Sequence, residues 1–320
     1  MKAVVYEKYG TVDMLKLMDI EKPVPEEDEV LVRVHAVSVN DWDWQLLQGS
    51  PFINRLINGL FKPKIKILGS DIAGRIEDVG KGVKILKPGD EVYGDLSGAW
   101  GGFAEYVCAK ENALALKPPG MTFEQAAAIP QAALLAVQAL IDKGKLKNGQ
   151  KILINGAGGG VGTFGIQITK QYNVEVTGVD SDDKLDMMQS LGFDHVIDYK
   201  EDDFTKSGRC YDLIVDTKTN RCVFNYVRVL NPNGIYASVG GSMIALLRMA
   251  LLSPFIKLFL KKKVQLVVLQ PNKDLPYMSE LFESGKVTPV IDSVYKLNEL
   301  PEAMRHFGEA GYKGKIIITV

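Results

Sequence analysis

Lys151-Ile152-Leu153-Ile154-Asn155 runs directly into Gly156-Ala157-Gly158-Gly159-Gly160-Val161-Gly162, and this junction decides the fold of the chain. The first stretch is short, apolar and rich in β-branched residues, which predicts a buried strand, and the apolar segment 163–172 predicts a helix. A strand, a glycine turn and a helix in this order present backbone N–H groups and a positive helix end to a pyrophosphate. We therefore predict a dinucleotide site at Gly156, Ala157, Gly158, Gly159, Gly160, Val161 and Gly162; the alternative is a glycine turn with a structural role only.

Candidate strands and helices alternate around this junction. The predicted strands are 151–155, 174–179, 195–197, 211–215 and 234–239, and the predicted helices are 163–172, 182–191 and 221–230. The strands are apolar on both faces, which is typical of a parallel sheet covered by helices on both sides. We therefore predict an α/β fold with a doubly wound parallel sheet.

The two ends of the chain differ from this middle part. The first third is rich in short candidate strands (2–6, 29–39, 71–79, 91–94 and 104–109) separated by Pro and Gly turns, which predicts a compact barrel-like domain. From about residue 264 the sequence returns to mixed β character. We expect segments 1–121 and 264–320 to form one discontinuous domain, with segment 122–263 inserted as the α/β domain.

Composition excludes some classes of partner. The net charge of −1 supplies no electrostatic footprint for nucleic acid. Cys108, Cys210 and Cys222 lie far apart and are odd in number, which indicates reduced thiols rather than a disulfide framework. The opening residues resemble a strand rather than a signal peptide. We expect a cytoplasmic protein.

Segment 243–260 is largely apolar and is followed by three lysines, 261–263. Arg248, Pro254 and Lys257 interrupt it, and it is short for a membrane-spanning helix. Pro254 is expected to break any helix here into two pieces. We expect a buried or subunit-facing helical pair, in keeping with a homodimer; contact with a membrane surface is the less favoured alternative.

The adenosine ribose of the dinucleotide is expected at the end of the second strand, 174–179. Asp180 stands there, and its carboxylate suits the ribose hydroxyls of NAD(H). Ser181 and Lys184 follow, and a hydroxyl and an ammonium there suit the 2′-phosphate of NADP(H). Lys184 is alternatively a solvated helix charge. The residues therefore leave open whether the cofactor is NADPH or NADH.

Further contacts are expected at the carboxyl edge of the sheet, where ligands bind in open α/β folds. Asp216 and Thr217 end one predicted strand, and Val239 and Gly240 end another. Asp216 is alternatively a residue that caps its own turn.

Taken together, the chain resembles the medium-chain dehydrogenase/reductase superfamily, in its zinc-free quinone oxidoreductase (zeta-crystallin-like) branch. The resemblance spans nearly the whole chain, in the right order. It rests on the glycine turn and on segments 29–34, 38–41, 69–74, 88–92, 102–106, 126–130, 194–199 and 314–315.

The resemblance implies a GroES-like catalytic domain built from both ends of the chain and a Rossmann domain, with the active site between them. It implies hydride transfer from NADPH to a quinone or an α,β-unsaturated carbonyl, with Asn40 near the reacting groups and Tyr199 near the 2′-phosphate. Gln45 and Leu47 stand where relatives often have Tyr and Arg, so a pocket bordered by Trp42 and Trp44 is expected to have its own shape.

Zinc-dependent relatives bind their metal through Cys, His and Glu or a second Cys. Here the corresponding positions are Asn40, Ser70 and Asp71, and Asn and Ser are poor zinc ligands. We expect no zinc, which favours reduction of quinones or activated C=C bonds. Asn40 is the candidate donor to the acceptor's carbonyl oxygen, and is alternatively a turn residue. The rival hypotheses are a dinucleotide-binding protein with little turnover and a membrane-peripheral reductase of lipophilic quinones.

Overall fold

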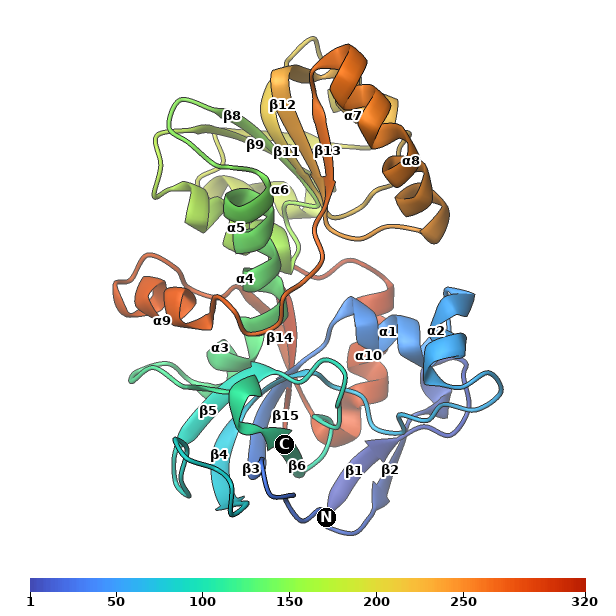
Figure 1. Ribbon diagram of the computed structural model, residues 1–320, viewed down its shortest axis with the longest axis vertical. Helices are drawn as coiled ribbons and strands as arrows, with labels where there is room; N and C mark the ends of the chain where they lie inside the picture. Colours follow the sequence, from blue (N-terminus) through green and yellow to red (C-terminus); the bar gives the residue numbers. More distant parts are fainter. The chain divides into compact units, whose positions relative to one another are not determined.

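The computed structural model describes residues 1–320, which form two units (Figure 1). The first unit contains residues 1–131 and 270–320, and the second contains residues 132–269. These boundaries fall later than the expected 122 and 264, and packing explains both differences. Helix α3 (Phe123–Ala128) packs on strands of the first unit, whereas strand β13 (Lys263–Leu266) pairs within the sheet of the second.

The second unit is built on a six-stranded parallel sheet with the order β10-β9-β8-β11-β12-β13. From β8 the chain first adds strands on one side of the sheet (β9 and β10) and then on the other side (β11, β12 and β13). Ligands of open α/β sheets bind at such a switch point, so the expected ligand position lies between the carboxyl ends of β8 and β11. The sheet confirms the predicted α/β class. Its remaining strands are β8 (Lys151–Asn155), β9 (Glu175–Asp180), β10 (His195–Asp198), β11 (Tyr211–Asp216) and β12 (Leu230–Ser238).

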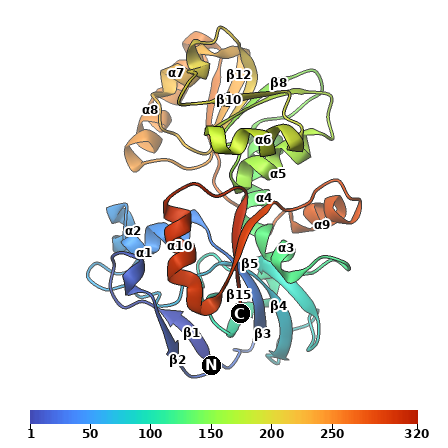
Figure 2. The same cartoon turned by 180° about the vertical axis from the view of Figure 1, so that it is seen from behind.

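Helices cover both faces of this sheet, with α5 and α6 on one side and α7 and α8 on the other (Figures 1 and 2). On the α7 side, Tyr226 stacks on Tyr236 of β12, with 4.5 Å between ring centroids, and both rings are buried. The helices are α5 (Gly160–Thr169), α6 (Asp182–Leu191), α7 (Val223–Arg228) and α8 (Met243–Leu260), with a π-helix η3 (Gln138–Lys143) and a 3-10 turn η4 (Phe204–Lys206).

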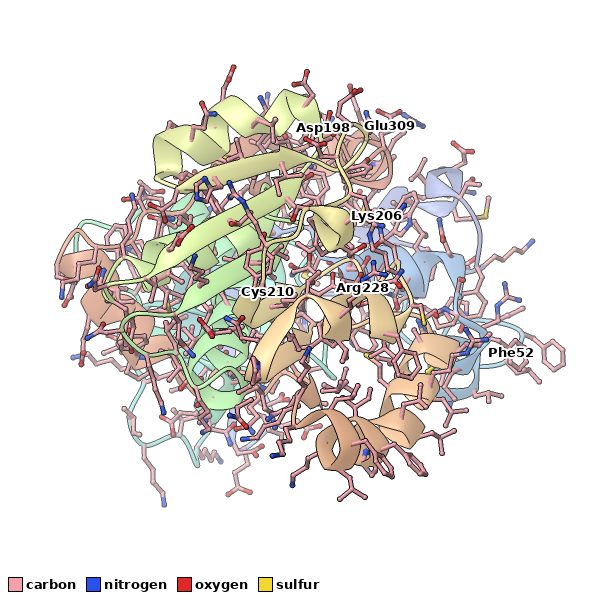
Figure 3. The ribbon with its side chains drawn as sticks, turned by 90° about the horizontal axis from the view of Figure 1, so that it is seen from above. Phe52, Asp198, Lys206, Cys210, Arg228 and Glu309 are labelled. Carbon is pink, nitrogen blue, oxygen red and sulfur yellow. The ribbon has the colours of Figure 1, made fainter.

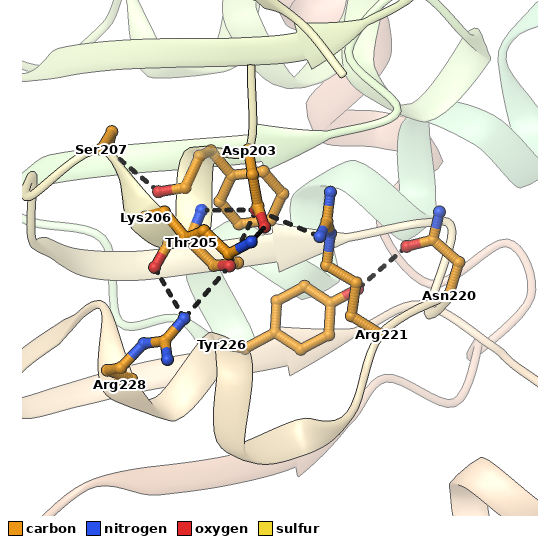
Figure 4. A network of polar contacts seen from close by, with 9 residues as sticks. Asp203, Thr205, Lys206, Ser207, Asn220, Arg221, Tyr226 and Arg228 are labelled. Carbon is orange, nitrogen blue, oxygen red and sulfur yellow. Dashed lines mark hydrogen bonds and ion pairs between the residues drawn. The ribbon is translucent and has the colours of Figure 1, made fainter. Parts of the chain in front are cut away.

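A polar network joins the turn η4 to helix α7 (Figure 4). Arg221 forms an ion pair with Asp203, with 3.0 Å between nitrogen and oxygen, and Arg228 donates to the carbonyl oxygen of Thr205 over 2.9 Å. Both guanidinium groups are therefore used inside the unit.

Helix α8 differs from the expected helical pair in its continuity, and of the two expected environments it does not have the buried one. It is one continuous helix that contains Pro254, rather than two pieces. Pro254 has no N–H to donate to the Ala250 carbonyl, and because both residues are exposed, water can supply that hydrogen bond. The helix is also not buried within the chain, because most of its apolar side chains are exposed.

The first unit is a β-rich domain that both ends of the chain build together. Its seven-stranded sheet has the order β14-β15-β3-β4-β5-β7, and β6 pairs with β3. A two-stranded sheet, β1 with β2, completes it. The strands are β1 (Lys2–Val5), β2 (Lys16–Asp19), β3 (Glu29–Ser38), β4 (Asp71–Val79), β5 (Glu91–Asp95), β6 (Tyr106–Lys110), β7 (Ala115–Leu116), β14 (Ile291–Lys296) and β15 (Lys315–Thr319).

The last strand, β15, joins the two ends of the chain because it lies between β14 and β3. Segment 264–320, expected to have mixed β character, contributes two helices, α9 and α10, as well as strands. The helices that remain are α1 (Asp41–Gln48), α2 (Phe52–Asn58), α4 (Pro130–Val137), α9 (Leu275–Glu283) and α10 (Leu300–Gly308). The 3-10 turns are η1 (Val12–Met14), η2 (Glu111–Ala113) and η5 (Leu297–Glu299). On α2, the Phe52 ring is exposed and points outward (Figure 3).

The packing of α5 against β8 predicts the effect of two matched substitutions. A Cβ added at Gly162 lies 2.4 Å from the Ala157 carbonyl oxygen, whereas one added at Gly159 meets nothing closer than 3.6 Å. We expect Gly162→Ala to lower the free energy of unfolding by about 1–3 kcal/mol, because the backbone must move. Gly159→Ala is expected to leave it nearly unchanged. Urea unfolding measures both, and equal stabilities of the two variants would contradict this packing.

Candidate functional site

The glycine turn between β8 and α5 folds back onto the end of β9. The backbone N–H groups of Gly156 and Ala157 both donate to the Val179 carbonyl oxygen, over 2.9 and 3.1 Å. Gly156 has a φ of +85°, and a Cβ there would lie 2.1 Å from Thr217 Oγ1. Only glycine fits this position, because the conformation is left-handed and the neighbouring loop is in contact.

The amino-terminal turn of α5 can receive an anion. Gly159 is the N-cap, and the first helical bond runs from Thr163 N to Gly159 O over 2.9 Å. The N–H groups of Gly160, Val161 and Gly162 precede that bond, so they have no partner inside the helix. Gly159, Gly160 and Val161 are partly exposed. The turn therefore fits a dinucleotide pyrophosphate through backbone donors and the helix dipole.

Asp180 holds the glycine turn in place. It ends β9 and is almost completely buried. Its Oδ2 accepts from Gly158 N over 2.9 Å, and its Oδ1 accepts from Ser181 N over 3.0 Å. The carboxylate thus fixes the backbone on both sides of the expected ribose position.

Lys184 lies beside the same carboxylate. Its Nζ is 3.5 Å from Asp180 Oδ1, and its side chain packs so closely on Gly158 that a Cβ there would lie 2.6 Å from Lys184 Cδ. Only 3% of Lys184 is exposed, so the alternative of a solvated helix charge is wrong. Tyr199, whose N–H donates to Asp180 O over 3.1 Å, brings a half-exposed ring to the same place. The residues predicted to bind the ribose end of the dinucleotide therefore lie close together: Asp180, Ser181, Lys184 and Tyr199.

Asp216 is fully buried, and four donors satisfy its carboxylate. Oδ1 accepts from Asn155 Nδ2 over 2.8 Å and from the N–H groups of Lys218 and Thr219 over 3.0 and 3.1 Å. Oδ2 accepts from Tyr236 OH over 2.7 Å. The side chain therefore caps its own turn, as the alternative reading of the sequence allowed, and shapes the loop that follows.

The other predicted sheet-edge residues lie at this same loop. Thr217 Oγ1 donates to Asn155 O over 3.0 Å, next to the glycine turn. Val239 N donates to Asp216 O over 2.7 Å, and the carbonyl of Gly240 accepts from Thr219 Oγ1 over 2.9 Å. The loops that follow β8, β11 and β12 therefore contact one another at the carboxyl edge of the parallel sheet.

The first unit contains a second site residue, Asn40, in a buried charged cluster. Asn40 is the N-cap of α1, and its side-chain oxygen accepts a hydrogen bond from Lys315 Nζ. Lys315 also donates to Val39 O over 3.2 Å. Burial lowers the pKa of Lys315, whereas the nearby carboxylates of Asp71, Asp43 and Asp95 oppose that shift.

The carboxyl groups around Lys315 are themselves strongly perturbed. Burial raises the pKa of Asp43 and of Asp71 to about 7, and it also raises the pKa of Asp95. Backbone donors oppose the shift at Asp43, whose oxygens accept from Gly69 N and Asn40 N over 2.8 and 2.9 Å. Such pKa values are typical of functional sites and of buried ion-pair networks alike.

Several buried polar atoms in this cluster lack a hydrogen-bond partner: Asn40 Nδ2, Asp71 Oδ1, Asp95 Oδ2, Ser70 Oγ and Gln131 Nε2. The Asn40 amide lowers the pKa of Asp71, although no aligned hydrogen bond joins the two groups. Unpaired buried donors and acceptors are rare, and this group of them leaves hydrogen-bonding capacity unused around Asn40.

Sequence reasoning missed the roles of Asp43, Asp95 and Lys315. Lys315 had one signal, since it is a lone charge at the start of an aliphatic strand, and Asp43 had another, since it stands three residues after an N-cap. The two tryptophans expected at a pocket differ from each other. Trp42 is exposed, whereas Trp44 packs on α10, with its ring centroid 6.5 Å from that of Phe307.

One cavity of about 500 Å³ lies at the opposite edge of the second unit's sheet. Its lining includes Lys151, Glu175, His195 and Tyr211, which begin or lie near the amino ends of strands. It is therefore separate from the glycine turn. No group of three or more His, Cys, Asp and Glu side chains in the structure could hold a metal ion.

Two family models match the chain. Residues 26–119 match the alcohol dehydrogenase GroES-like domain, and residues 191–318 match the zinc-binding dehydrogenase family. The first match lies in the β-rich unit, and the second spans the later strands of the parallel sheet and the return to the first unit.

Full-length relatives agree with these matches. A chloroplastic quinone oxidoreductase of Triphysaria versicolor is 35% identical over 99% of this chain and 98% of its own. The chloroplastic NADPH-dependent alkenal/one oxidoreductase of Arabidopsis thaliana is 32% identical over 99% of this chain and 79% of its own. The solved quinone oxidoreductase of Coxiella burnetii has a TM-score of 0.87 and 29% identity over 100% of this chain and 99% of its own. The chain belongs to the quinone oxidoreductase branch of the medium-chain dehydrogenase/reductase superfamily.

Proposed function

We propose that the protein is an NADPH-dependent reductase of quinones or α,β-unsaturated carbonyl compounds. The observation that carries this proposal is the glycine turn, which sits at the switch point of a parallel sheet with its helix N–H groups unpaired. The relatives' names supply the acceptor class, since they include quinone oxidoreductases and an alkenal/one oxidoreductase.

The preference for NADPH rests on the Asp180–Lys184 pair. A lone carboxylate at the ribose position repels a 2′-phosphate, but here an ammonium 3.5 Å away offsets its charge. Ser181 and Tyr199 bring a hydroxyl each to the same place. We propose that this group of residues accepts the phosphate.

When bound, the dinucleotide supplies the hydride. The residues of this chain hold its pyrophosphate at the first turn of α5 and present Asn40 Nδ2 as a hydrogen-bond donor to the acceptor's carbonyl oxygen. Lys315 is proposed as the positioning residue, because its bond to Asn40 Oδ1 fixes which atom of the amide is free. A donor of this kind stabilises the negative charge that develops on the oxygen.

Zinc is not part of the proposal. The Asn40 oxygen already accepts from an ammonium group, and a second cation beside Lys315 would be repelled. Asn and Ser are also poor ligands for zinc.

The first test is acceptor-dependent oxidation of NADPH with a panel of quinones and enones. We expect turnover by the wild type and a fall in kcat of about 10²-fold in Asn40→Asp, which keeps an oxygen for Lys315 but removes the donor. Asn173→Ala, on an exposed loop, is the control, and circular dichroism checks the fold. If no acceptor supports oxidation, the protein is a dinucleotide-binding protein rather than a reductase.

The second test addresses cofactor choice by measuring the Kd of NADPH and NADH by fluorescence titration. Lys184→Ala removes the ammonium group that offsets the negative charge of Asp180, so we expect NADPH to bind about tenfold more weakly and NADH to change little. Lys170→Ala, an exposed lysine at the end of α5, serves as the control. Unchanged NADPH affinity in Lys184→Ala would show that the phosphate assignment is wrong.

The third test concerns the charge of the Lys315 cluster. Lys315 lowers the pKa of Asp43, Asp71 and Asp95, so Lys315→Met must raise those values further. An acid with a raised folded-state pKa stabilises the fold below its unfolded-state value, and this contribution is lost as the pH rises through the folded-state value.

We therefore expect Lys315→Met to cost about 3–5 kcal/mol of unfolding free energy at about pH 8, and clearly less at about pH 5. Urea unfolding at the two pH values measures this. Lys110→Met, which breaks an exposed pair with Asp28, is the control and should show little effect at either pH. A cost for Lys315→Met that does not depend on pH would contradict the proposed charge coupling.

A further inference from the structure

Helix α8 presents apolar side chains to solvent along its length. Its mean hydropathy is 1.9 over 18 residues, yet only 11% of that window is buried inside the protein. In Figure 3 many side chains of this orange helix project outward from the molecule. A contiguous exposed apolar surface of this kind indicates an interaction site.

The helix has two apolar faces rather than one. Met249 and Ile256 are buried in the core of the second unit, and Leu252 is partly buried beside them. The other face repeats at helical spacing and is exposed throughout: Ile244, Leu247, Leu251, Phe255 and Leu258. A helix that only covered its own sheet would have polar residues on that outer face.

The charge of the surrounding sequence is uniformly positive. Segment 217–273 contains nine of the chain's 38 Lys and Arg residues and none of its 39 Asp and Glu residues. Inside the unit, Arg221 pairs with Asp203, Arg228 binds Thr205 O, and Lys262 binds Val227 O. Four exposed cations lie on α8 or directly after it, and their charged groups form no ion pair or hydrogen bond within the protein: Arg248, Lys257, Lys261 and Lys263.

An apolar face bordered by unpaired cations matches the surface of an anionic bilayer. Phe and Leu side chains enter the boundary between headgroups and acyl chains, while lysine stems extend so that their ammonium groups remain at the phosphates. Basic residues beside such an apolar face are attracted to anionic lipid headgroups.

Two other occupants fit less well. A membrane-spanning role requires all sides of α8 to face lipid, but Met249 and Ile256 are packed in the unit's core. A second copy on a two-fold axis brings the same segment against itself, and segment 217–273 has no acidic side chain with which to pair its cations.

We propose that α8 lies in the plane of an anionic membrane surface and attaches the protein to it, with its outer face among the headgroups. This proposal does not depend on the reductase activity, because binding to vesicles needs neither cofactor nor acceptor. It places the protein beside any quinone or enone that is dissolved in the bilayer.

Vesicle flotation of the full-length protein tests the proposal. We expect at least about tenfold more protein to float with vesicles of phosphatidylcholine mixed with phosphatidylglycerol than with phosphatidylcholine alone, and we expect salt to weaken this binding. Protein that stays in the soluble fraction with the anionic vesicles would overturn the proposal, even if the enzyme reduces quinones.

Matched variants locate the contact. Leu251→Glu/Phe255→Glu places two charges on the outer face of α8 and should abolish flotation. Val24→Glu/Ile85→Glu places two charges at exposed apolar residues of the other unit and should not. Lys257→Glu/Lys261→Glu should remove the preference for anionic vesicles. Circular dichroism and NADPH titration verify that each variant is folded.

Sedimentation of the same variants tests the second-copy alternative. If Leu251→Glu/Phe255→Glu converts a dimer into monomers while flotation is unchanged, the outer face covers another copy of the chain and the proposal is wrong. If the variant loses flotation and its oligomeric state does not change, the proposal is supported.

Discussion

The bond between Lys315 and Asn40 joins the two ends of the chain at the centre of the β-rich unit. Lys315 begins the last strand, whereas Asn40 and the acids Asp43, Asp71 and Asp95 all come from the first hundred residues. A buried ammonium is costly unless carboxylates surround it, and buried carboxylates are costly without a cation. Each end of the chain therefore supplies the charge that the other needs, and this favours the return of the chain after the inserted unit.

Carboxylates serve the second unit differently. Asp180 and Asp216 accept hydrogen bonds from the backbone of the loops at the carboxyl edge of the sheet, and the side chains of Asn155 and Tyr236 complete the set of donors at Asp216. These groups set the shape of a binding surface whose ligand contacts come from backbone N–H groups. In the first unit, by contrast, polar atoms remain buried and unpaired around Asn40. One unit thus offers a binding turn whose backbone is held by buried carboxylates, and the other offers unused hydrogen-bonding groups where the reaction is proposed.

Only one face of helix α8 packs in the core of its own unit, and the opposite face is free to contact another molecule. Met249 and Ile256 are buried in the core, whereas Leu251 and Phe255 are exposed and contribute no buried apolar surface to the folded unit. Their apolar character is therefore most simply explained by a contact outside the unit. The absence of acidic residues from segment 217–273 points in the same direction, because a surface that only needs to be soluble usually mixes both signs of charge.

Local sequence patterns determined the fold class, because strand periodicity and the glycine turn depend on residues a few positions apart. Strands β4 and β8 and helix α6 begin and end at the predicted residues. Only the tertiary structure decided the burial of Lys184, the continuity of α8 through Pro254, the domain boundaries and the Lys315 cluster. The burial of Lys184 and the continuity of α8 depend on whether the rest of the unit covers a helix face or leaves it open to water. The domain boundaries and the Lys315 cluster depend on pairings between segments that lie far apart in the sequence. A local pattern can mark a residue such as Lys315 as unusual, but it does not identify the distant residues that the side chain will contact.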